Sequence, residues 1–420
     1  MSFFTNNNNN NNQSDTYPQP EQWPIHDGQT KQSIKIDGCP NDTVSALNFS
    51  PQINNGICHF AASSWDGSTR VWELNTNNVQ ANGKKVNQQN FPILANCWSP
   101  DGQRIYLAGA DNKAYCWEIG NDNFRQIGQH DKAITSIHCM MVNNQEVIVT
   151  GSLDQSIRFW MLNNSNPVFK LDLGFKIYDM DACFPYVVAI GQNQNGKQYS
   201  VITVANGQPQ IMNKAANGQD WPVKLDHQYN CVEIFKNKNN NYSPDGFGIG
   251  AIEGRACIIY FNEDERKKVD PKGVGKPSNW AASFAFKCHR IEKDTNRLSN
   301  KDHSLLFNIN FIKFHPEFQT LLTAGSDGSY TFWDKDQRQR LGPLYKKGQS
   351  SLPVRLNMPL TAGAISPDGK LFVFATGYDW TFGSEFANLK GNQPSIYIHH
   401  DFINKPYQDN AVNGMTPKSR

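Results

Sequence analysis

The hydrophobic positions of this chain fall into short runs that alternate with polar turn residues. Runs such as 105–108, 147–150 and 371–375 are rich in β-branched and aromatic residues, and Gly, Asp, Asn or Pro residues bound them. Short apolar runs with such boundaries predict β-strands that are joined by tight turns. Helical periodicity is weak throughout, so the pattern predicts an all-β fold.

One turn-and-strand unit recurs along the chain. Each copy has a tight turn that contains Asp, and a strand that reaches a Trp follows it. The copies are 64–67 before Trp72, 109–112 before Trp117, 151–154 before Trp160 and 325–328 before Trp333. The first three of these Trp residues follow one another at intervals of 45 and 43 residues, which is the period of WD repeats.

A single four-stranded sheet of this kind cannot bury both of its faces, so the repeats are expected to stack radially into a closed β-propeller. We expect seven blades, within 44–72, 95–117, 134–160, 176–204, 231–261, 308–333 and 362–399. Blades four and five keep the strand pattern but lose both the Asp and the Trp. An extra strand at 33–36 is expected to pair into the last blade and close the ring, which removes a sheet edge.

The recurring Asp and Trp residues have buried structural roles in this interpretation. The carboxylates are expected to accept hydrogen bonds from turn amides, and the rings to fill the space between neighbouring sheets. The residues assigned these roles are Asp66, Asp111, Asp154, Asp327, Trp72, Trp117 and Trp160. Only blade three is expected to add a His to this network, namely His130 with Asp154 and Trp160.

Composition sets the domain boundaries. Residues 1–31, which include an Asn run at 6–12, are predicted to form a disordered tail, and 406–420 a flexible C-terminal tail. The propeller occupies 32–405. Seven repeats of ~43 residues need roughly 300 residues, and the surplus within 33–399 is assigned to two polar insertions at 262–306 and 335–358.

Several functional classes are excluded at this level. The formal net charge is +2 and the pI about 8.0, so no global charge dictates a partner. Nothing approaches 18 consecutive apolar residues and the N-terminus lacks a secretory signal, so no membrane insertion is expected. Nine scattered Cys without a Cys-x-x-Cys pair indicate reduced interior residues of a cytosolic or nuclear protein. No catalytic triad, phosphate loop or metal-ligand spacing is apparent, so we expect no enzyme activity, no cofactor and no small-molecule substrate.

Basic and aromatic residues gather late in the chain. They are Phe284, Phe286, Lys287, His289 and Arg290 before blade six, and Trp333, Lys335, Arg338, Arg340, Lys346 and Lys347 after its closing strand begins. Arg255 is assigned to the tight turn of blade five, at the place of the turn Asp. These residues are expected to meet at the rim of one propeller face. Cations beside aromatic rings suit an acidic peptide or single-stranded nucleic acid, and an ordinary solvated charge run is the alternative.

Particular segments of the chain resemble a known family. The segments 250–255 (GAIEGR), 284–290 (FAFKCHR) and 332–336 (FWDKD) are similar to those of the nuclear-pore mRNA export factors, which are Rae/Gle-type WD-repeat propellers. The likeness covers about 33–400. The first two segments also fit the sister family, the mitotic checkpoint propellers of kinetochores. The third segment, together with Tyr378-Asp379-Trp380 and the following Gly383, Glu385 and Phe386, favours the export factors.

The resemblance implies a non-enzymatic scaffold that binds an extended acidic motif, the GLEBS segment of a nucleoporin, across one face. By similarity, the contacts would come from Arg255, Phe286, Trp333, Lys335, Arg338 and Arg340, and we add Lys287 to this peptide-binding set. The family also implies association with mRNA or mRNA–protein particles. The expected location is the nuclear pore complex at the nuclear rim, with protein also in nucleus and cytoplasm. The alternative is a checkpoint propeller that binds GLEBS-like motifs of checkpoint kinases.

Overall fold

The computed structural model describes residues 33–400, except for 206, 217, 219, 223–224, 238–242, 263–282, 292–304, 342–353, 357, 382 and 384–392. The two predicted tails therefore lie outside the described residues, as do Lys346 and Lys347. No helix occurs in the described part of the chain, and hence none of it could cross a membrane as a long apolar helix.

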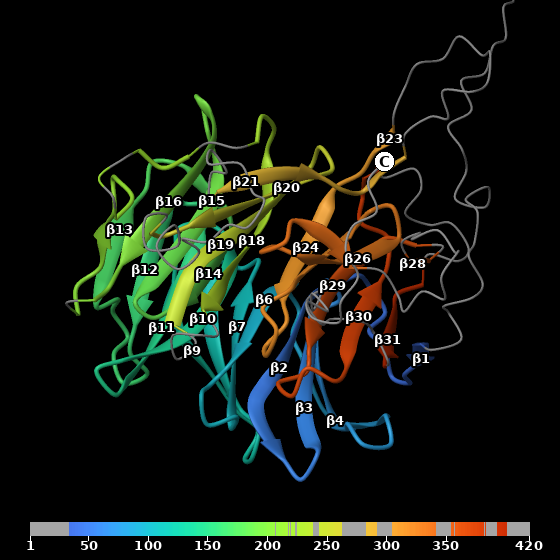
Figure 1. Cartoon of the computed structure of the whole chain (residues 1–420). Coiled ribbons are helices and arrows are strands. Elements are labelled where there is room, and N and C mark those ends of the chain that lie inside the picture. Colours follow the sequence, from blue (N-terminus) through green and yellow to red (C-terminus); the bar gives the residue numbers. More distant parts are fainter. Residues whose placement is uncertain are drawn as a thin grey trace, which may run out of the picture.

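The strands form seven sheets that are arranged as the blades of a β-propeller (Figure 1). Blade one consists of β2 (Val44–Asn54), β3 (Ile57–Ser64), β4 (Ser68–Asn75) and β5 (Gln80–Gln88). Blade two consists of β6 (Ile93–Trp98), β7 (Arg104–Gly109), β8 (Lys113–Glu118) and β9 (Asn123–Gln129). Blade three consists of β10 (Ile134–Val142), β11 (Gln145–Ser152), β12 (Ser156–Trp160) and β13 (Phe169–Asp172). Blades four and five are β14 (Lys176–Cys183), β15 (Tyr186–Asn193), β16 (Gly196–Thr203), β17 (Gln210–Ile211); and β18 (Tyr229–Asn237), β19 (Ser243–Ala251), β20 (Arg255–Tyr260), β21 (Phe284–Lys287).

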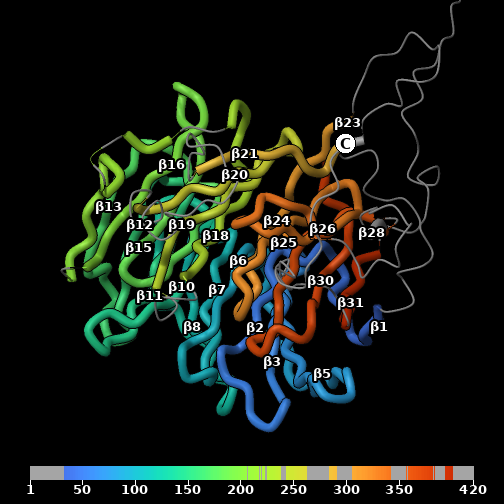
Figure 2. Tube along the Cα trace, in the orientation of Figure 1, coloured from blue at the N-terminus to red at the C-terminus, as the bar shows by residue number. Residues whose placement is uncertain are grey.

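Blades six and seven complete the ring. Blade six is β24 (Ile309–Phe314), β25 (Leu321–Gly325), β26 (Ser329–Asp334), β27 (Gln339–Leu341), and β28 (Val354–Arg355) also pairs with β26. Blade seven is β29 (Leu360–Ile365), β30 (Phe372–Thr376), β31 (Ser395–His399) and β1 (Ser33–Lys35); β22 (Arg290–Ile291) and β23 (Leu305–Leu306) form a separate ribbon. The trace passes from blade to blade in chain order, as the colours of Figure 2 show.

The predicted seven-bladed all-β propeller is therefore confirmed. The two segments predicted to be polar insertions, however, contain strands that belong to the blades. Strand β21 lies within 262–306 and supplies the outermost strand of blade five. Likewise, β27 and β28 lie within 335–358 and pair with β26. The sequence interpretation missed these outer strands because they are short: β21, β27 and β28 have four, three and two residues.

The N-terminal strand closes the ring, as predicted. β1 pairs antiparallel with β31, so that Ser33 lies opposite His399 and Lys35 opposite Tyr397. The Oγ of Ser33 lies 2.9 Å from Nδ1 of His399, and the backbone N–H of Ile36 donates to the carbonyl of Ile396 at 3.0 Å. Two segments from opposite ends of the chain thus share one sheet, and in Figure 1 blue β1 lies beside red β31.

The first strand of every blade faces the axis and carries a β-bulge near its start. The bulged residues line a central cavity of about 280 Å³ and are Ser45, Leu94, Thr135, Tyr178, Asn230, Asn310 and Thr361. Several of them donate to the next blade: Asn230 Nδ2 donates to the carbonyl of Ile309 at 2.8 Å, and Asn310 Nδ2 to that of Leu360 at 3.0 Å. Side chains re-aimed by the bulges therefore tie the inner strands into a ring.

Hydrophobic side chains fill the spaces between neighbouring blades. Trp72, Trp117 and Trp160 are each at most 2% exposed and lie in three different inter-blade clusters. All nine cysteines are free thiols. The sheets therefore face one another through apolar layers, and their turns and outermost strands remain on the surface.

Candidate functional site: a basic and aromatic track between blades five and six

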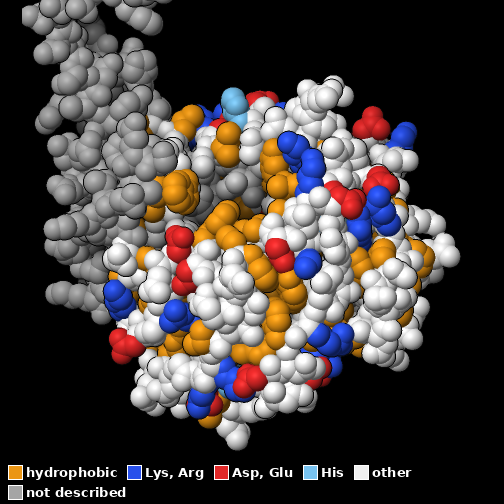
Figure 3. All heavy atoms as spheres, turned by 180° about the vertical axis from the view of Figure 1, so that it is seen from behind, with side chains coloured by type: hydrophobic (Ala, Val, Ile, Leu, Met, Phe, Trp, Pro, Cys, Tyr) orange, Lys and Arg blue, Asp and Glu red, His pale blue; other side chains and the backbone are white. Residues whose placement is uncertain are grey.

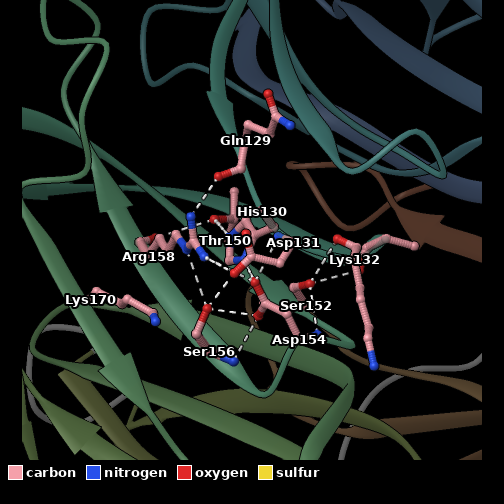
Figure 4. A network of polar contacts seen from close by, with 12 residues as sticks. Gln129, His130, Asp131, Lys132, Thr150, Ser152, Asp154, Ser156, Arg158 and Lys170 are labelled. Atoms are coloured by element: carbon pink, nitrogen blue, oxygen red, sulfur yellow. Dashed lines mark hydrogen bonds and ion pairs between the residues drawn. The ribbon is translucent and has the colours of Figure 1, made fainter.

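A buried polar network organises the Asp turn of blade three (Figure 4). Nδ1 of His130 lies 2.9 Å from Oδ2 of Asp154, and its Nε2 lies 2.7 Å from Oγ1 of Thr150. The Nε1–H of Trp160 donates to the same Thr150 oxygen at 2.8 Å. Burial lowers the pKa of His130 to about 4, against the opposing effect of Asp154, so the ring is neutral at pH 7. A neutral ring that donates through Nδ1 to the carboxylate accepts through Nε2, so the Thr150 hydroxyl donates to it.

Blade six contains the same network, which corrects the prediction that only blade three has one. Nδ1 of His289 lies 2.8 Å from Oδ1 of Asp327, and its Nε2 lies 2.9 Å from Oγ1 of Thr323. The Nε1–H of Trp333 donates to Thr323 at 2.9 Å. His289 is 7% exposed, so it is an interior residue and not part of a basic surface.

The remaining Asp turns use other partners. Asp66 accepts from the backbone N–H groups of Asn41 and Ser68, each at 2.8 Å. Asp111 accepts from the hydroxyl of Tyr115 at 2.5 Å. In each case the carboxylate satisfies donors around its own turn, which is the structural role that the sequence indicates.

The outer strand β21 carries the aromatic part of the predicted site. Phe284 and Phe286 are half-buried and alternate with the exposed Ala285 and Lys287. Since side chains alternate across a strand, Phe284 and Phe286 lie on one face of the blade-five sheet, and Lys287 lies on the other. Phe284 and Phe286 pack against the cluster that joins blade five to blade six.

Blade six supplies the ring and the cations that meet these phenylalanines. The ring centroids of Phe286 and Trp333 are 4.8 Å apart. The guanidinium carbon of Arg338 lies 4.2 Å from the centroid of the Phe284 ring, within the range of a cation–π interaction. Arg340 is exposed and lies opposite Trp333 in the β26–β27 pair, so both side chains are on the same face of their sheet.

Two further cations lie at the far end of β21, on the other face of its sheet. Arg255 is directly opposite Lys287 in the β20–β21 pair. The Nε of Arg255 lies 3.8 Å from Oε2 of Glu253, and Nε2 of His227 lies 3.7 Å from the same oxygen. We use the name basic–aromatic track for Arg255, Phe284, Phe286, Lys287, Trp333, Arg338 and Arg340.

The turn of blade five corrects the placement of Arg255. Blade one has Asp66 and Gly67 between β3 and β4, and blade five has Glu253 and Gly254 between β19 and β20. Glu253 therefore occupies the Asp position, and Arg255 begins the next strand. The guanidinium of Arg290 donates to the carbonyls of Gly254 and Glu253 at 3.0 and 2.9 Å, so it stabilises the turn.

Lys335 lies inside the propeller. The residue is 6% exposed, its Nζ lies 4.9 Å from the centroid of the Phe235 ring, and it lies 3.0 and 3.1 Å from the two carboxylate oxygens of Asp336. Of the seven predicted peptide-binding residues, Lys335 is the one that is buried. Its charge supports the turn from which Arg338 projects.

The predicted residues do not meet at the rim of one face. Arg255 follows the turn between the second and third strands of blade five, whereas Arg338 lies in the turn between the third and fourth strands of blade six. These turns are at opposite ends of the blades. The track instead follows the outer wall, along β21 from Phe284 to Lys287, which spans about 10 Å at ~3.3 Å per residue.

The chemistry of the track fits an extended acidic ligand. The guanidinium groups of Arg338, Arg340 and Arg255 offer planar pairs of donors that match carboxylates or phosphates. Half-buried Phe286 and Trp333 offer an apolar anchor between them. Over the propeller as a whole the charges are mixed, and Figure 3 shows Lys, Arg, Asp and Glu side chains interspersed on one side of it.

A second cluster of charged side chains lies at the axis, where it links the inner strands of neighbouring blades. The carboxylates of Asp179, Asp181 and Glu233 accept from the backbone N–H groups of Val232, Ile234 and Phe314 in the next blade. Glu233 also pairs with Lys313 at 2.8 Å, and burial, against the opposing effect of Lys313, raises the pKa of Glu233 to about 7. Each carboxylate holds a neighbouring strand, so we assign these groups to structure.

Comparison with known proteins gives three kinds of match. The family model for the WD domain, G-beta repeat, matches residues 30–73 and 122–161. The mRNA export factor rae-1 of Caenorhabditis elegans is 33% identical over 367 residues, 87% of this chain and 87% of the relative. The mRNA export factor of Xenopus tropicalis is 33% identical over 355 residues, 84% of this chain and 86% of the relative. The structure titled "Crystal structure of RRP9 WD40 repeats" aligns with a TM-score of 0.63 at 12% identity over 89% of this chain and 98% of that one, so it shows a common fold.

Proposed function

Because this chain belongs to the family of mRNA export factors built on a WD-repeat β-propeller, we propose that it is a non-enzymatic scaffold of the nuclear pore complex. In this role it binds the acidic GLEBS motif of a nucleoporin and supports the export of mRNA from the nucleus. The observation that carries the proposal is the contact of Phe286 with Trp333, at 4.8 Å between centroids, with Arg338 stacked on the adjacent Phe284 at 4.2 Å.

An acidic peptide suits this arrangement better than a neutral one. Arg338 and Arg340 lie near one end of β21, and Arg255 and Lys287 lie at the other end, about 10 Å away. An extended segment advances ~3.3 Å per residue, so two acidic residues about three positions apart would reach both pairs of cations. An apolar residue between them would contact Phe286 and Trp333. The proposal therefore specifies the ligand: an extended segment with an apolar side chain flanked by carboxylates.

The aromatic anchor is held in place before a ligand arrives. Trp333 donates to Thr323, which contacts His289, which in turn contacts Asp327. A ring with a fixed position loses little side-chain entropy on binding, which favours affinity. RNA is a second proposed ligand of the same track, through base stacking and phosphate contacts. We expect the peptide to bind more tightly, because it buries apolar surface as well as pairing charges.

The location follows from the partner. A protein held by a nucleoporin is expected at the nuclear rim, with a fraction in nucleus and cytoplasm. The export role is favoured over the checkpoint role because the relatives named above are mRNA export factors.

An affinity purification tests the proposal. The full chain, the Phe286→Ala variant and a Met141→Ala control would be tagged and used to capture proteins from nuclear extract, with mass spectrometry of the partners. Met141 is a suitable control because it is 44% exposed and lies in blade three, away from the track. We expect the wild type and the control to recover a nucleoporin with an acidic motif, and Phe286→Ala to lose it while melting as a folded protein. Recovery of checkpoint kinases would support the alternative role, and recovery of ubiquitin-ligase subunits would point to another class of adaptor.

A further inference from the structure

Among the described strands that are outermost in their blades, β5 of blade one is the longest. It has nine residues, whereas the outermost strands of the other six blades have two to seven. Within the described part of the chain, β5 pairs with β4 and with no other strand. A free strand edge exposes backbone donors and acceptors to which another strand can bond. The outer wall of blade one therefore offers an extended edge for strand pairing.

Two residues of β5 direct their backbone groups toward this edge. The N–H of Gln89 donates to the carbonyl of Gly67 at 3.0 Å, in the register of the β4–β5 pairs that precede it. Hydrogen-bonded and non-hydrogen-bonded pairs alternate along an antiparallel ladder, so Asn87 bonds to β4 whereas Val86 and Gln88 do not. The N–H and C=O groups of Val86 and Gln88 therefore point away from β4, with the spacing that an added strand requires.

The two sides of β5 differ in chemistry. Val86 is 58% exposed and is on the side of the sheet away from blade two. Lys85 is on the other side, where its Nζ donates to Oδ2 of Asp122 in blade two at 2.8 Å. A β-bulge brings Lys84 to the same side as Lys85, and the Nζ of Lys84 lies 3.0 Å from Oε1 of Glu73. One side of the edge is therefore apolar, and the other is cationic.

The charge of this edge favours an acidic partner strand. β5 contains two Lys residues and neither Asp nor Glu. The side chain of Lys84 is 44% exposed, and an ammonium group has three donors, so it can bind a second carboxylate beside Glu73. A second copy of β5 would bring lysines against lysines, which is unfavourable across a strand pair. The edge therefore disfavours pairing between copies of this chain and favours an acidic strand.

We propose that the free edge of β5 is a docking site for an extended, acidic segment of a partner protein, which adds to blade one as a fifth strand. The backbone of the segment would exchange hydrogen bonds with Val86 and Gln88, as in other cases of β-strand addition. Its apolar residues would cover Val86, and the acidic residues that alternate with them would face Lys84 and Lys85. This inference does not rest on the proposed function, because the basic–aromatic track lies in blades five and six.

A peptide that alternates apolar and acidic residues is the probe for the test. Four Val-Glu repeats labelled with fluorescein would be titrated into the full chain. Three comparison probes accompany this peptide. The peptide with Lys in place of Glu tests the charge, and the peptide with every backbone nitrogen methylated tests the backbone hydrogen bonds. A twelve-nucleotide oligouridylate tests whether the edge binds nucleic acid instead.

Proline substitutions test the edge itself. Val86→Pro removes the outward N–H, and proline is tolerated on an edge strand where the N–H faces solvent. The matched control is Ile211→Pro, because Ile211 is 40% exposed on β17, the outermost strand of blade four. The N–H of Met212 donates to the carbonyl of Val201 at 2.8 Å, so the N–H of Ile211 also points outward. Val86→Ala separates loss of the apolar side chain from loss of the N–H.

We expect Val86→Pro to weaken binding of the Val-Glu peptide at least roughly tenfold, Val86→Ala to weaken it about threefold, and Ile211→Pro to bind like wild type. The three comparison probes should bind wild type more weakly than the Val-Glu peptide does. Hydrogen exchange measured by mass spectrometry should slow within 80–88 when the peptide binds. Thermal melting shows whether each variant is folded, and the methylated peptide tests the same hydrogen bonds without a variant.

The proposal is overturned if the wild-type chain does not bind the Val-Glu peptide, if folded Val86→Pro binds it unchanged, or if a comparison probe binds as tightly. Slower exchange outside 80–88, together with loss of binding in Phe286→Ala, would place the peptide on the basic–aromatic track and would also overturn it. A wild-type dimer that Val86→Pro dissociates would assign the edge to a second copy of this chain instead of a partner protein.

Discussion

The ring of Phe286 lies 4.8 Å from the ring of Trp333, across the junction between blades five and six. Trp333 belongs to two arrangements at once: its indole N–H takes part in the buried His289 network, and its ring packs against Phe286 as part of the basic–aromatic track. The interior of blade six therefore fixes the position of the aromatic anchor on which the proposed peptide would bind.

Breaking the network of blade six should affect both stability and binding. Asp327→Ala leaves His289 and Ser329 without a buried acceptor, which should cost about 1–3 kcal/mol of unfolding free energy. It should also weaken binding of an acidic GLEBS peptide, because Trp333 loses its support. Asp154→Ala breaks the equivalent network in blade three and should lower stability without affecting binding. Denaturant unfolding and peptide titration of both variants check this prediction. If Asp327→Ala and Asp154→Ala change the peptide affinity equally, the buried network of blade six does not support the role of Trp333 in binding.

The inter-blade tryptophans should be large contributors to stability. Trp117→Ala and Trp160→Ala should each cost about 3–5 kcal/mol, because a large ring at 1% exposure leaves a cavity when truncated. Trp65→Ala, at a position that is 48% exposed, should stay within about 0.5 kcal/mol of wild type. Chemical denaturation provides the comparison. Near-native stability of the first two variants would contradict the assignment of these residues to the core.

Ring closure should depend on the first strand. A chain that starts at residue 41 lacks β1 and exposes the edge of β31, and it also loses the burial of Ile36, which is 5% exposed. We expect its melting temperature to fall by several degrees, whereas a chain that lacks only residues 1–25 should melt like the full protein. Equal melting temperatures for the two truncations would mean that β1 contributes nothing to closure.

His130 should make part of the stability depend on pH. Its pKa of about 4 in the folded state is below the ordinary value of 6.5, so the unfolded chain binds the proton more readily. The stability that the neutral ring provides is therefore complete above pH 6.5 and is lost as the pH falls toward 4. The difference in unfolding free energy between wild type and His130→Asn should shrink by at most roughly 3 kcal/mol over that interval. A difference that grows on acidification would contradict the neutral ring.

Much of the fold could be predicted from the sequence because its signals are local. The turn containing Asp66 and the strand that reaches Trp72 repeat at a fixed spacing, and the segment 33–36 alternates polar and apolar residues and precedes the strands of blade one. The outer strand β21 gave no such signal, since only alternate residues of a four-residue strand are half-buried. The network of blade six was missed because His289 precedes Asp327 by 38 residues, whereas His130 precedes Asp154 by 24.

The arrangement of the site depends on three-dimensional contacts that the sequence does not display. Lys335 and Arg338 are three residues apart, yet the first is buried beside Phe235 and the second stacks on Phe284. Arg255 and Lys287 are far apart in the chain and directly opposite each other in the sheet. Residue type alone identified the cations, but their burial and their face are decided by strand pairing and by the turn geometry of blade six.

The central claim is that the basic–aromatic track binds an acidic peptide, and a charge-reversal titration tests it most directly. Arg255, Arg338 and Arg340 would be changed together to Glu, with Lys84→Glu, Lys170→Glu, Lys370→Glu as a control at exposed cations elsewhere. Both variants should remain folded, because most of the altered charges are exposed and such charges contribute little to stability. Arg255 and Arg338 are half-buried, so thermal melting of the track variant checks its fold. Binding of an acidic GLEBS peptide and of a single-stranded RNA would be measured at low and at moderate salt.

We predict that the track variant loses at least roughly thirtyfold in peptide affinity while the control binds like wild type. Peptide binding to wild type should survive moderate salt, because Phe286 and Trp333 bury apolar surface. RNA affinity should instead fall steeply, with a slope of about −0.7 per phosphate contact. If the track variant binds the peptide as tightly as wild type does, these cations form an ordinary solvated surface and the proposed binding site is wrong.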